Sequence, residues 1–372
     1  MDAAIYSWYS QELGAVYEAE LGRLGLRDVV TAFRSDIGGT NVDHAREVFR
    51  FIETHRPCVA LAFDIEKFFD TLDHCQLKAQ WQRILGQSRL PSDHFALFRN
   101  LTRFAWVERE DAFTALGISK HNPKLGGRRQ ICSAREFRVR IRDENLIRQN
   151  PRATKGIPQG SPISALLSNV YMLDFDQAVQ SAISAIGGLY RRYCDDVIVV
   201  VPTDHERTAF DVVQAAVTDS NLEVNPDKVH RAGFPLASTQ PADKAIQYLG
   251  FTYDGVRTLV RASSLNRYYS KMRAGVSLAK QAQRKQNRKE QKKGVALTGL
   301  KRRKIYLQYS YLIKRTSILN GRDRKEQSNF LTYAYKASKK LGAPEIKRQV
   351  RNHWPKLQEA IAKKLDGQLA DP

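Results

Sequence analysis

The 372-residue chain contains few cysteines and no long apolar run. Its four cysteines, Cys58, Cys75, Cys132 and Cys194, are scattered and form no C-x-x-C pair. This argues against a disulfide framework and a zinc site, and favours the reducing cytoplasm. No stretch approaches the ~20 consecutive apolar residues of a membrane span, and MDAAIYSWYSQELG lacks the basic and apolar regions of a secretory signal. The sequence therefore predicts a cytoplasmic protein without membrane contact.

Acidic residues are scarce in the last part of the chain. Residues 261–372 hold 29 Lys and Arg against 7 Asp and Glu, whereas residues 1–260 hold 31 against 32. The net positive charge of +21 therefore comes entirely from the residues after 260. A region with so much positive charge is expected to bind a polyanion, most often nucleic acid. The alternative is a solvated basic tail; an anionic membrane is disfavoured because the region has few apolar anchors.

Apolar patterning predicts a mixed helix and strand body followed by a helical, basic module. The body is expected to contain helices over 40–55, 67–85, 161–183 and 204–220, strands over 58–63, 188–193 and 197–201, and a strand pair over 245–255. Residues 104–153, rich in Arg and Gly, predict strands and loops. Apolar faces such as that of Tyr268, Met272 and Val276 predict helices after residue 260, where 280–294 is almost devoid of apolar side chains.

Two adjacent aspartates, Asp195 and Asp196, stand at the tip of the predicted hairpin, where their charges repel one another. Asp64 ends the predicted strand over 58–63, and the Gly/Pro loop KGIPQGSPIS (155–164) opens a long helix. Strand-end carboxylates that converge on one point suit a two-metal phosphoryl-transfer site, because Mg²⁺ prefers a few carboxylate oxygens. Two ions about 4 Å apart stabilise the attacking and the leaving oxygen. Such ions would offset the repulsion of the aspartates.

The order of these features resembles that of reverse transcriptases. AFDIEKFFDTLDH, KGIPQGSPISALLSNVY, YCDD, NLEVNPDKVH and QYLGF resemble motifs A to E of that family, over about residues 28–260. The residues within these motifs are similar to those of bacterial reverse transcriptases of the group II intron, retron and defence-associated kinds. The resemblance implies an α+β right-hand polymerase fold with an antiparallel palm sheet. Its expected parts are fingers (1–57 and 77–153), palm (58–76 and 154–256) and a basic helical thumb (257–372).

The resemblance also implies a metal site. Asp64 and Asp195 would ligate two Mg²⁺ ions, for which Mn²⁺ could substitute, with help from the Ile65 carbonyl. Asp196 would be a weaker ligand. The nearby Asp70 and Asp73 are expected to be helix-start charges instead of ligands.

Further positions would handle the nucleotide. Phe69 would sit beneath the sugar and exclude a 2′-hydroxyl, although with Phe68 adjacent it could instead be a core residue. Gln159 and Gly160 would form the floor beside the incoming base, where glycine permits close backbone approach; the alternative is a plain helix-entry turn. Lys228 would protonate the departing pyrophosphate as a general acid, or be an exposed turn lysine.

Other residues would meet nucleic acid or phosphate. The expected primer and template contacts are Tyr193, Cys194, Tyr248, Leu249, Gly250, Lys301, Arg302 and Arg303. The basic residues among them would track the backbone without reading sequence, and Cys194 is expected to pack near the primer end and not to act as a nucleophile. Arg34 would either meet the triphosphate or be a surface arginine, and Tyr309 is expected to pack in the core.

Elements of other reverse transcriptases are not found. The chain shows no ribonuclease H set, no H-N-H or cysteine-rich endonuclease segment, and no clear Asn-Ala-x-x-His or Val-Thr-Gly element of retron enzymes. The remaining profile is most similar to the defence-associated, unknown-group enzymes, in which a structured non-coding RNA often serves as template and the DNA product acts against phage. The expected partners are that RNA, a DNA primer or product, and dNTPs. The alternatives are a group II intron or maturase-like protein, a non-catalytic RNA-binding scaffold, and template-independent or protein-primed synthesis.

Overall fold

A four-stranded antiparallel sheet forms the centre of the protein, seen in a computed structural model that describes residues 2–34, 36–119, 130–311 and 329–363. In spatial order the strands are β4 (Leu189–Tyr193), β5 (Asp196–Pro202), β1 (Cys58–Asp64) and β6 (His230–Phe234). Strands β1 and β5 are apolar along nearly their whole length because both faces of the sheet are covered. The predicted strand over 58–63 and the predicted hairpin are confirmed.

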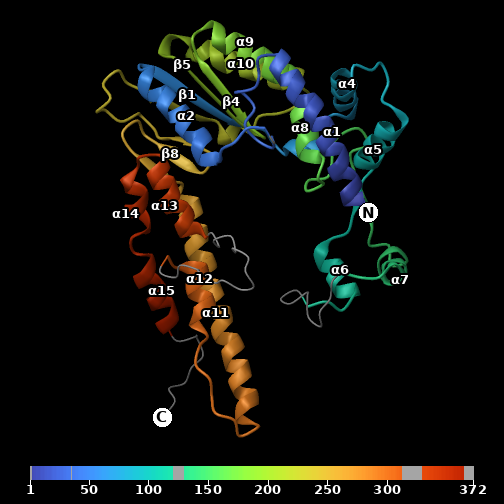
Figure 1. The fold of residues 1–372 in the computed structure, drawn as a ribbon, viewed down its shortest axis with the longest axis vertical. Helices are drawn as coiled ribbons and strands as arrows, with labels where there is room; N and C mark the ends of the chain where they lie inside the picture. Colours follow the sequence, from blue (N-terminus) through green and yellow to red (C-terminus); the bar gives the residue numbers. More distant parts are fainter. Residues whose placement is uncertain (1, 35, 120–129, 312–328, 364–372) are drawn as a thin grey trace, which may run out of the picture.

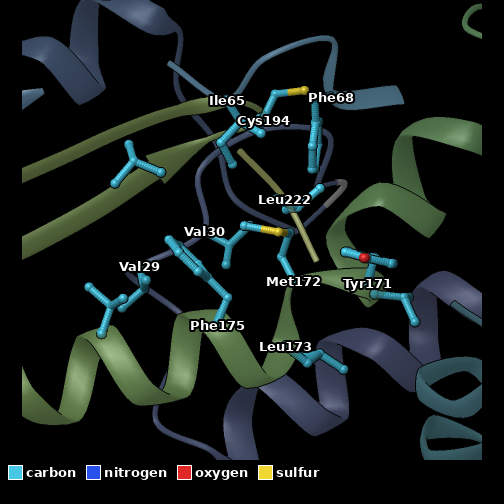
Figure 2. Packing of buried hydrophobic residues seen from close by; sticks show 14 of the residues in the cluster. Val29, Val30, Ile65, Phe68, Tyr171, Met172, Leu173, Phe175, Cys194 and Leu222 are labelled. Carbon is cyan, nitrogen blue, oxygen red and sulfur yellow. The ribbon is translucent and has the colours of Figure 1, made fainter. Parts of the chain in front are cut away.

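One face of the sheet is covered by four helices (Figure 1). They are α1 (Asp2–Arg23), α8 (Ser164–Tyr171), α9 (Leu173–Ala185) and α10 (Glu206–Asp219). Alternate strand residues, among them Leu61, Phe63 and Val199, pack with these helices in one core cluster. Figure 2 shows Phe68, Met172, Phe175 and Cys194 within the same cluster.

The opposite face belongs to a second core cluster. Helix α2 (Asn41–Thr54) and the three-stranded sheet of β7 (Ile246–Tyr248), β8 (Phe251–Tyr253) and β9 (Thr258–Val260) contribute to it. The helix begins where predicted, and the Asp43 carboxylate accepts hydrogen bonds from the backbone N–H and the hydroxyl of Thr40, each at 2.8 Å. The β7–β8 pair confirms the strand pair predicted over 245–255.

The described residues after 260 are mostly helical, as predicted, and extend away from the sheet (Figure 1). Its helices are α11 (Ala262–Gln291), α12 (Arg302–Tyr309), α13 (Phe330–Lys340), α14 (Pro344–Val350) and α15 (His353–Ala362). Most of the basic run 280–294 continues α11. Tyr268, Met272 and Val276 are buried in the second core cluster, as is Tyr309, so these helices share a core with the sheet. None of the described helices has the length and apolar character of a membrane-spanning segment.

Two predicted helices are each divided in two. The helix predicted over 67–85 becomes α3 (Phe68–Thr71) and α4 (His74–Ile84), because the Asp73 carboxylate caps α4 by accepting from the N–H groups of Cys75 (2.9 Å) and Gln76 (3.0 Å). The role of Asp73 as a helix-start charge is thus confirmed. The helix predicted over 161–183 breaks at Met172 between α8 and α9.

The prediction of strands and loops over 104–153 is confirmed only in part among the described residues 104–119 and 130–153, because short helices also occur there. Strands β2 (Ala105–Trp106) and β3 (Arg148–Gln149) have two residues each, and helices α6 (Arg109–Ala115), α7 (Ala134–Phe137) and η2 (Arg138–Arg142) lie between them. A small cluster of Phe113, Leu116, Ile118 and Ile141 holds them together. The helix α5 (Ser92–Thr102) precedes this segment. The few apolar residues that define these helices were obscured by the surrounding arginines.

Candidate active site

Three carboxylates meet at one edge of the central sheet. Asp64, the last residue of β1, lies directly opposite Asp196, the first residue of β5. Asp195 precedes Asp196 in the tight turn between β4 and β5, and its carbonyl accepts a hydrogen bond from the Ile65 N–H at 3.3 Å. The turn is therefore tied to the residue that follows Asp64. The structure brings together the three aspartates singled out in the sequence.

Their charges are coupled. The pKa of Asp196 is raised to about 6, first because the side chain is largely buried and then because Asp195 and Asp64 repel its charged form. The positive charges of Arg261 and Lys228 offset part of this effect. Burial and the two neighbouring carboxylates thus both disfavour the charged form of Asp196.

Lys228 contacts the site directly. Its Nζ lies 2.7 Å from Asp64 Oδ2, and this hydrogen bond is the main reason that the pKa of Lys228 is raised. The lysine belongs to the short helix η4 (Pro226–Lys228), which begins after Asn225. The Asn225 N–H donates to the Asp64 carbonyl at 3.0 Å, and its side chain accepts from the Asp227 N–H at 3.1 Å. The loop that carries Lys228 is therefore docked on the end of β1.

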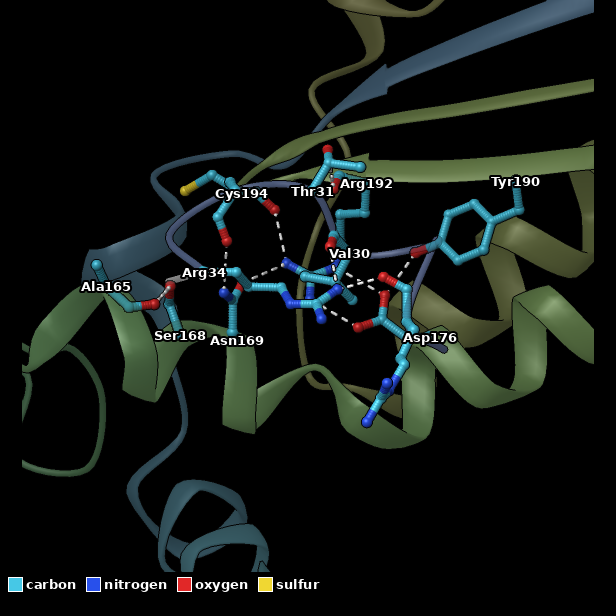
Figure 3. A network of polar contacts seen from close by, with 12 residues as sticks. Val30, Thr31, Arg34, Ala165, Ser168, Asn169, Asp176, Tyr190, Arg192 and Cys194 are labelled. Carbon is cyan, nitrogen blue, oxygen red and sulfur yellow. Dashed lines mark hydrogen bonds and ion pairs between the residues drawn. The ribbon is translucent and has the colours of Figure 1, made fainter. Parts of the chain in front are cut away.

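The backbone of the turn between β4 and β5 is held by a buried arginine, Arg192 (Figure 3). Cys194 adopts a left-handed conformation, φ 60°, which costs a non-glycine residue roughly 1–3 kcal/mol. Its carbonyl accepts a hydrogen bond from Arg192 Nη1 at 3.0 Å. The same nitrogen donates to Asn169 Oδ1 at 3.1 Å. Arg192 thus anchors the residue immediately before Asp195.

Asp176 in α9 pairs with this arginine, and both side chains are 0% exposed. Its two oxygens accept from Arg192 Nε at 2.7 Å and Nη2 at 2.6 Å, and Oδ1 also accepts from the Tyr190 hydroxyl at 2.6 Å. Burial lowers the pKa of Arg192, but attraction to Asp176 outweighs this and raises it above its usual value. Thr31 adds a further tie, because its N–H and hydroxyl donate to the Arg192 carbonyl at 2.9 and 3.0 Å.

The loop 155–164 lies against the start of α3. Phe68 is buried in the core, whereas Phe69 is only partly buried, and the Phe69 carbonyl accepts from the Ile157 N–H at 2.9 Å. Gln159 and Gly160 are exposed, and Gly160 has φ 97°. Gly156 also has a positive φ, 91°, and a Cβ there would lie 3.0 Å from the Asp70 carbonyl oxygen. This close approach explains the glycine at position 156.

A comparison with known protein families identifies the family to which the chain belongs. The family described as reverse transcriptase (RNA-dependent DNA polymerase) matches residues 39–253, more than half of the chain. The chain belongs to the reverse transcriptase family. The matched stretch includes Asp64, Asp195, Asp196, Lys228 and the β7–β8 turn. No curated protein matches the chain.

Solved telomerase structures show a distant likeness to this reverse transcriptase. Apo telomerase from Candida tropicalis has 13% identity and a TM-score of 0.41, over 69% of this chain and 40% of that chain. Telomerase from Candida albicans in complex with a TWJ fragment of telomeric RNA has 10% identity and a TM-score of 0.42, over 96% of this chain and 48% of that chain. The chain therefore spans less than half the length of these telomerases.

The carboxylates of this reverse transcriptase suit a divalent cation in their chemistry. They supply hard oxygen donors, which Mg²⁺ prefers, and a bound cation would oppose the repulsion that Asp195 and Asp64 exert on the charged form of Asp196. Within the described ranges, no group of three or more Asp, Glu, His or Cys side chains is close enough to hold a metal ion. In this structure one Asp64 oxygen is taken by Lys228.

The residues predicted to meet the primer occupy different environments. Tyr193 is partly buried at the end of β4, Cys194 is buried as expected, and Tyr248 is buried in the second core cluster. Leu249 and Gly250 form the β7–β8 turn, with φ values of 47° and 90°. A cavity of about 80 Å³ joins this turn to Asp64, Asp196, Lys228 and Arg261.

The remaining residues that were predicted to meet nucleic acid or phosphate do not lie beside the three aspartates. Lys301, Arg302 and Arg303 are exposed at the start of α12, in the helical part of the protein (Figure 1). The interpretation of Arg34 as a surface arginine is wrong, because its side chain is 2% exposed and pairs with Glu18 at 2.5 Å and with Asp36 at 3.0 Å. Its contact with a triphosphate stays a prediction.

Sequence reasoning missed the buried pair of Arg192 and Asp176. A signal was present, because Tyr190 and Arg192 share the inward face of β4 and Asp176 lies among the buried residues of α9. Charged residues at inward positions of two elements indicate a paired, buried contact, since such residues are almost never fully buried unless paired.

Proposed function

We propose that the chain is an RNA-directed DNA polymerase that extends a DNA primer on an RNA template with dNTPs. The observation that carries this proposal is the meeting of Asp64, Asp195 and Asp196 at one sheet edge, next to Lys228. Phosphoryl transfer requires charge stabilisation and positioning more than covalent chemistry from the protein. A rigid sheet edge with three carboxylates supports both requirements.

In this proposal Asp64 and Asp195 hold two Mg²⁺ ions, or Mn²⁺ in their place, with the Ile65 carbonyl assisting and Asp196 binding more weakly. Bound cations of this kind stabilise the attacking and the leaving oxygens. Arg192 keeps Asp195 in position through the Cys194 carbonyl, and the Ile65 N–H ties the turn to the end of β1.

The protein would handle the nucleotide with groups around the carboxylates. Lys228, an ammonium group held by Asp64, would leave Asp64 and donate a proton to the departing pyrophosphate. Phe69, which is partly buried and packs against the core cluster that contains Phe68, would lie beneath the sugar and exclude a 2′-hydroxyl. Gln159 and Gly160, both exposed, would form the floor beside the incoming base.

The polymerase parts would divide as the sequence predicts. Fingers would comprise residues 1–57 and 77–153, the palm 58–76 and 154–256, and the thumb 257–372. The exposed Lys301, Arg302 and Arg303, with the basic half of α11, would follow the template–primer backbone. The Leu249–Gly250 turn, next to Asp64 across the small cavity, would support the primer end.

The biological role that we propose is bacterial anti-phage defence in the cytoplasm, with a structured non-coding RNA as template. It rests on the resemblance to the defence-associated, unknown-group enzymes and on the strongly basic thumb region. Sequencing the nucleic acids that co-purify with the protein tests it. One abundant RNA species with complementary DNA is expected, whereas a random RNA population would contradict it.

Activity is tested with a DNA primer annealed to RNA, Mg²⁺ and the four dNTPs. The expected result is primer extension that depends on dNTPs and stops when the divalent cation is chelated. Tight RNA binding without any incorporation would contradict the proposal and would favour the non-catalytic scaffold. Extension without a template would instead indicate template-independent synthesis.

A further inference from the structure

A second cavity, of about 400 Å³, opens beside the start of α3 and the short β2–β3 ladder. The rings of Phe104 and Trp106 line it, together with Pro151, Arg152 and Gly156. Its volume falls within the range of about 300–1,000 Å³ that is typical of small-ligand sites. Of the residues considered above, Asp70 and Gly156 line this cavity, whereas the three aspartates, Lys228, Phe69, Gln159 and Gly160 do not.

The two rings have no role in a hydrophobic core. Phe104 and Trp106 are partly buried, with ring centroids 6.2 Å apart and planes inclined by 35°. Neither belongs to any of the three core clusters of the described residues, although Val107, the next residue, packs against the smallest one. Their aromatic surface is therefore presented to the cavity.

The polar groups of the cavity are engaged with the protein. Arg152 Nη1 donates to the Asp70 carbonyl at 2.7 Å, and Asn150 Nδ2 donates to the Lys155 carbonyl at 2.9 Å. Arg152 is the one cation among the cavity's lining residues, and Asp70 brings a carboxylate, so the lining does not suit a triphosphate. Two aromatic rings and a guanidinium suit a nucleobase, because unpaired bases stack on aromatic side chains and on arginine planes.

The position of the cavity narrows the choice of base. Asp70 follows Phe69, the proposed sugar gate, and Gly156 lies three residues before Gln159, the proposed floor. Hydrogen bonds from the Gly156 N–H to the Leu72 carbonyl (2.8 Å) and from the Ile157 N–H to the Phe69 carbonyl join the two walls. The cavity therefore adjoins the proposed nucleotide site on the side of β2 and β3.

We propose that this cavity receives an unpaired base of the template strand, one position ahead of the base being copied, stacked against Phe104 and Trp106. Arg103 and Lys155, adjacent in sequence to lining residues, would accommodate the phosphates on either side of that nucleotide. This inference rests on the proposed polymerase function. It adds a site for the single-stranded part of the template, distinct from the paired part.

The test is a binding measurement without dNTPs, so it does not depend on synthesis. The probe is a DNA primer annealed to RNA with a three-nucleotide 5′ overhang, carrying 2-aminopurine at the second unpaired position. The wild-type protein is expected to quench this base on binding. In the Phe104→Leu/Trp106→Leu variant we expect the quenching to be lost and the affinity to fall about tenfold or more. The affinity for a blunt-ended duplex should not change.

Two controls keep the test decisive. Phe95→Leu removes an aromatic side chain that is 43% exposed on α5, outside the cavity, and should behave as wild type. Phe104→Tyr/Trp106→Phe retains both rings and should retain quenching, which separates loss of stacking from loss of folding. Equal losses for overhanging and blunt duplexes, or no loss for either, would overturn the inference.

The inference would also be overturned if the Phe104→Leu/Trp106→Leu variant had a raised KM for dNTPs but bound the overhanging duplex like the wild type. In that case the cavity would serve the incoming nucleotide. Failure of the proposed function has a different signature. In that case no dNTP is incorporated by the wild-type protein, while quenching of the overhang base remains measurable.

Discussion

Replacing Asp176 tests how the turn between β4 and β5, which carries Asp195, is held in place. In Asp176→Asn the fully buried Arg192 loses its counter-charge and one of its two acceptors on this side chain. Removing one partner of a buried ion pair typically costs about 3–5 kcal/mol. This is a large part of a total stability of about 5–15 kcal/mol. We therefore expect the free energy of unfolding to fall by about 3–5 kcal/mol in urea titrations.

A double variant separates stability from positioning. In Asp176→Leu/Arg192→Met no charge is buried, and such replacements of whole pairs are often neutral or stabilising. The carbonyl of Cys194 and the Oδ1 of Asn169 lose their Arg192 donor, and the Tyr190 hydroxyl loses its Asp176 acceptor, which costs about 1–3 kcal/mol for each unsatisfied group. The double variant should therefore be about as stable as Asp176→Asn, yet less active, because nothing holds the Cys194 carbonyl.

The assay is single-turnover primer extension at a temperature well below the unfolding midpoint of both variants. Direct Mn²⁺ binding to each variant gives a readout that a purely structural role would not change, and the double variant should bind the ion more weakly. If activity and metal affinity instead rise in step with stability, the positioning role of Arg192 is refuted.

Three further predictions concern single side chains. Lys228→Met should reduce the maximal incorporation rate by about 10²-fold or more, in the range of lost general-acid catalysis, with little change in primer–template affinity; Asp227→Asn, beside it, is the control. Phe69→Val should let ribonucleotides in, measured as a smaller ratio of kcat/KM between dNTP and NTP, whereas Phe68→Val should lower stability instead. The ion pair with Lys340 is the main reason that the pKa of Asp43 is lowered to about 2 from 3.8. Its stabilisation is therefore complete above about pH 4 and lost as pH falls through about 2. Asp43→Asn should cost less than about 1 kcal/mol at neutral pH, because solvent screens a pair in which Lys340 is 46% and Asp43 33% exposed, and it should cost nothing near pH 2.

The parts of the fold that could be predicted from the sequence are those set by local patterns. The uninterrupted apolar residues of β1 and β5 mark buried strands, and the charges that end them mark the sheet edge where Asp64 and Asp196 meet. The sequence also places Asp73 at a helix start, because its side chain can accept from N–H groups two and three residues ahead.

The remaining features depend on contacts between distant segments or on weak local signals. The pairing of Arg192 with Asp176 requires β4 to lie on α9, and that of Lys228 with Asp64 requires η4 to dock on β1, so neither follows from local spacing. The break at Met172 lies within a continuous apolar pattern and leaves no composition signal. Between 104 and 153, short helices around Phe113 and Ile141 carry too few apolar residues to stand out from the arginines.

The central claim is that Asp64, Asp195 and Asp196 form the polymerase centre. The most direct measurement is the single-turnover rate of one dNTP incorporation on a primed RNA, compared among the wild type, Asp64→Asn, Asp195→Asn, Asp196→Asn and the exposed control Asp211→Asn. We predict no detectable product from the first two variants, a slow but measurable rate from Asp196→Asn, and a wild-type rate from Asp211→Asn. Incorporation by Asp195→Asn at the wild-type rate would contradict the account.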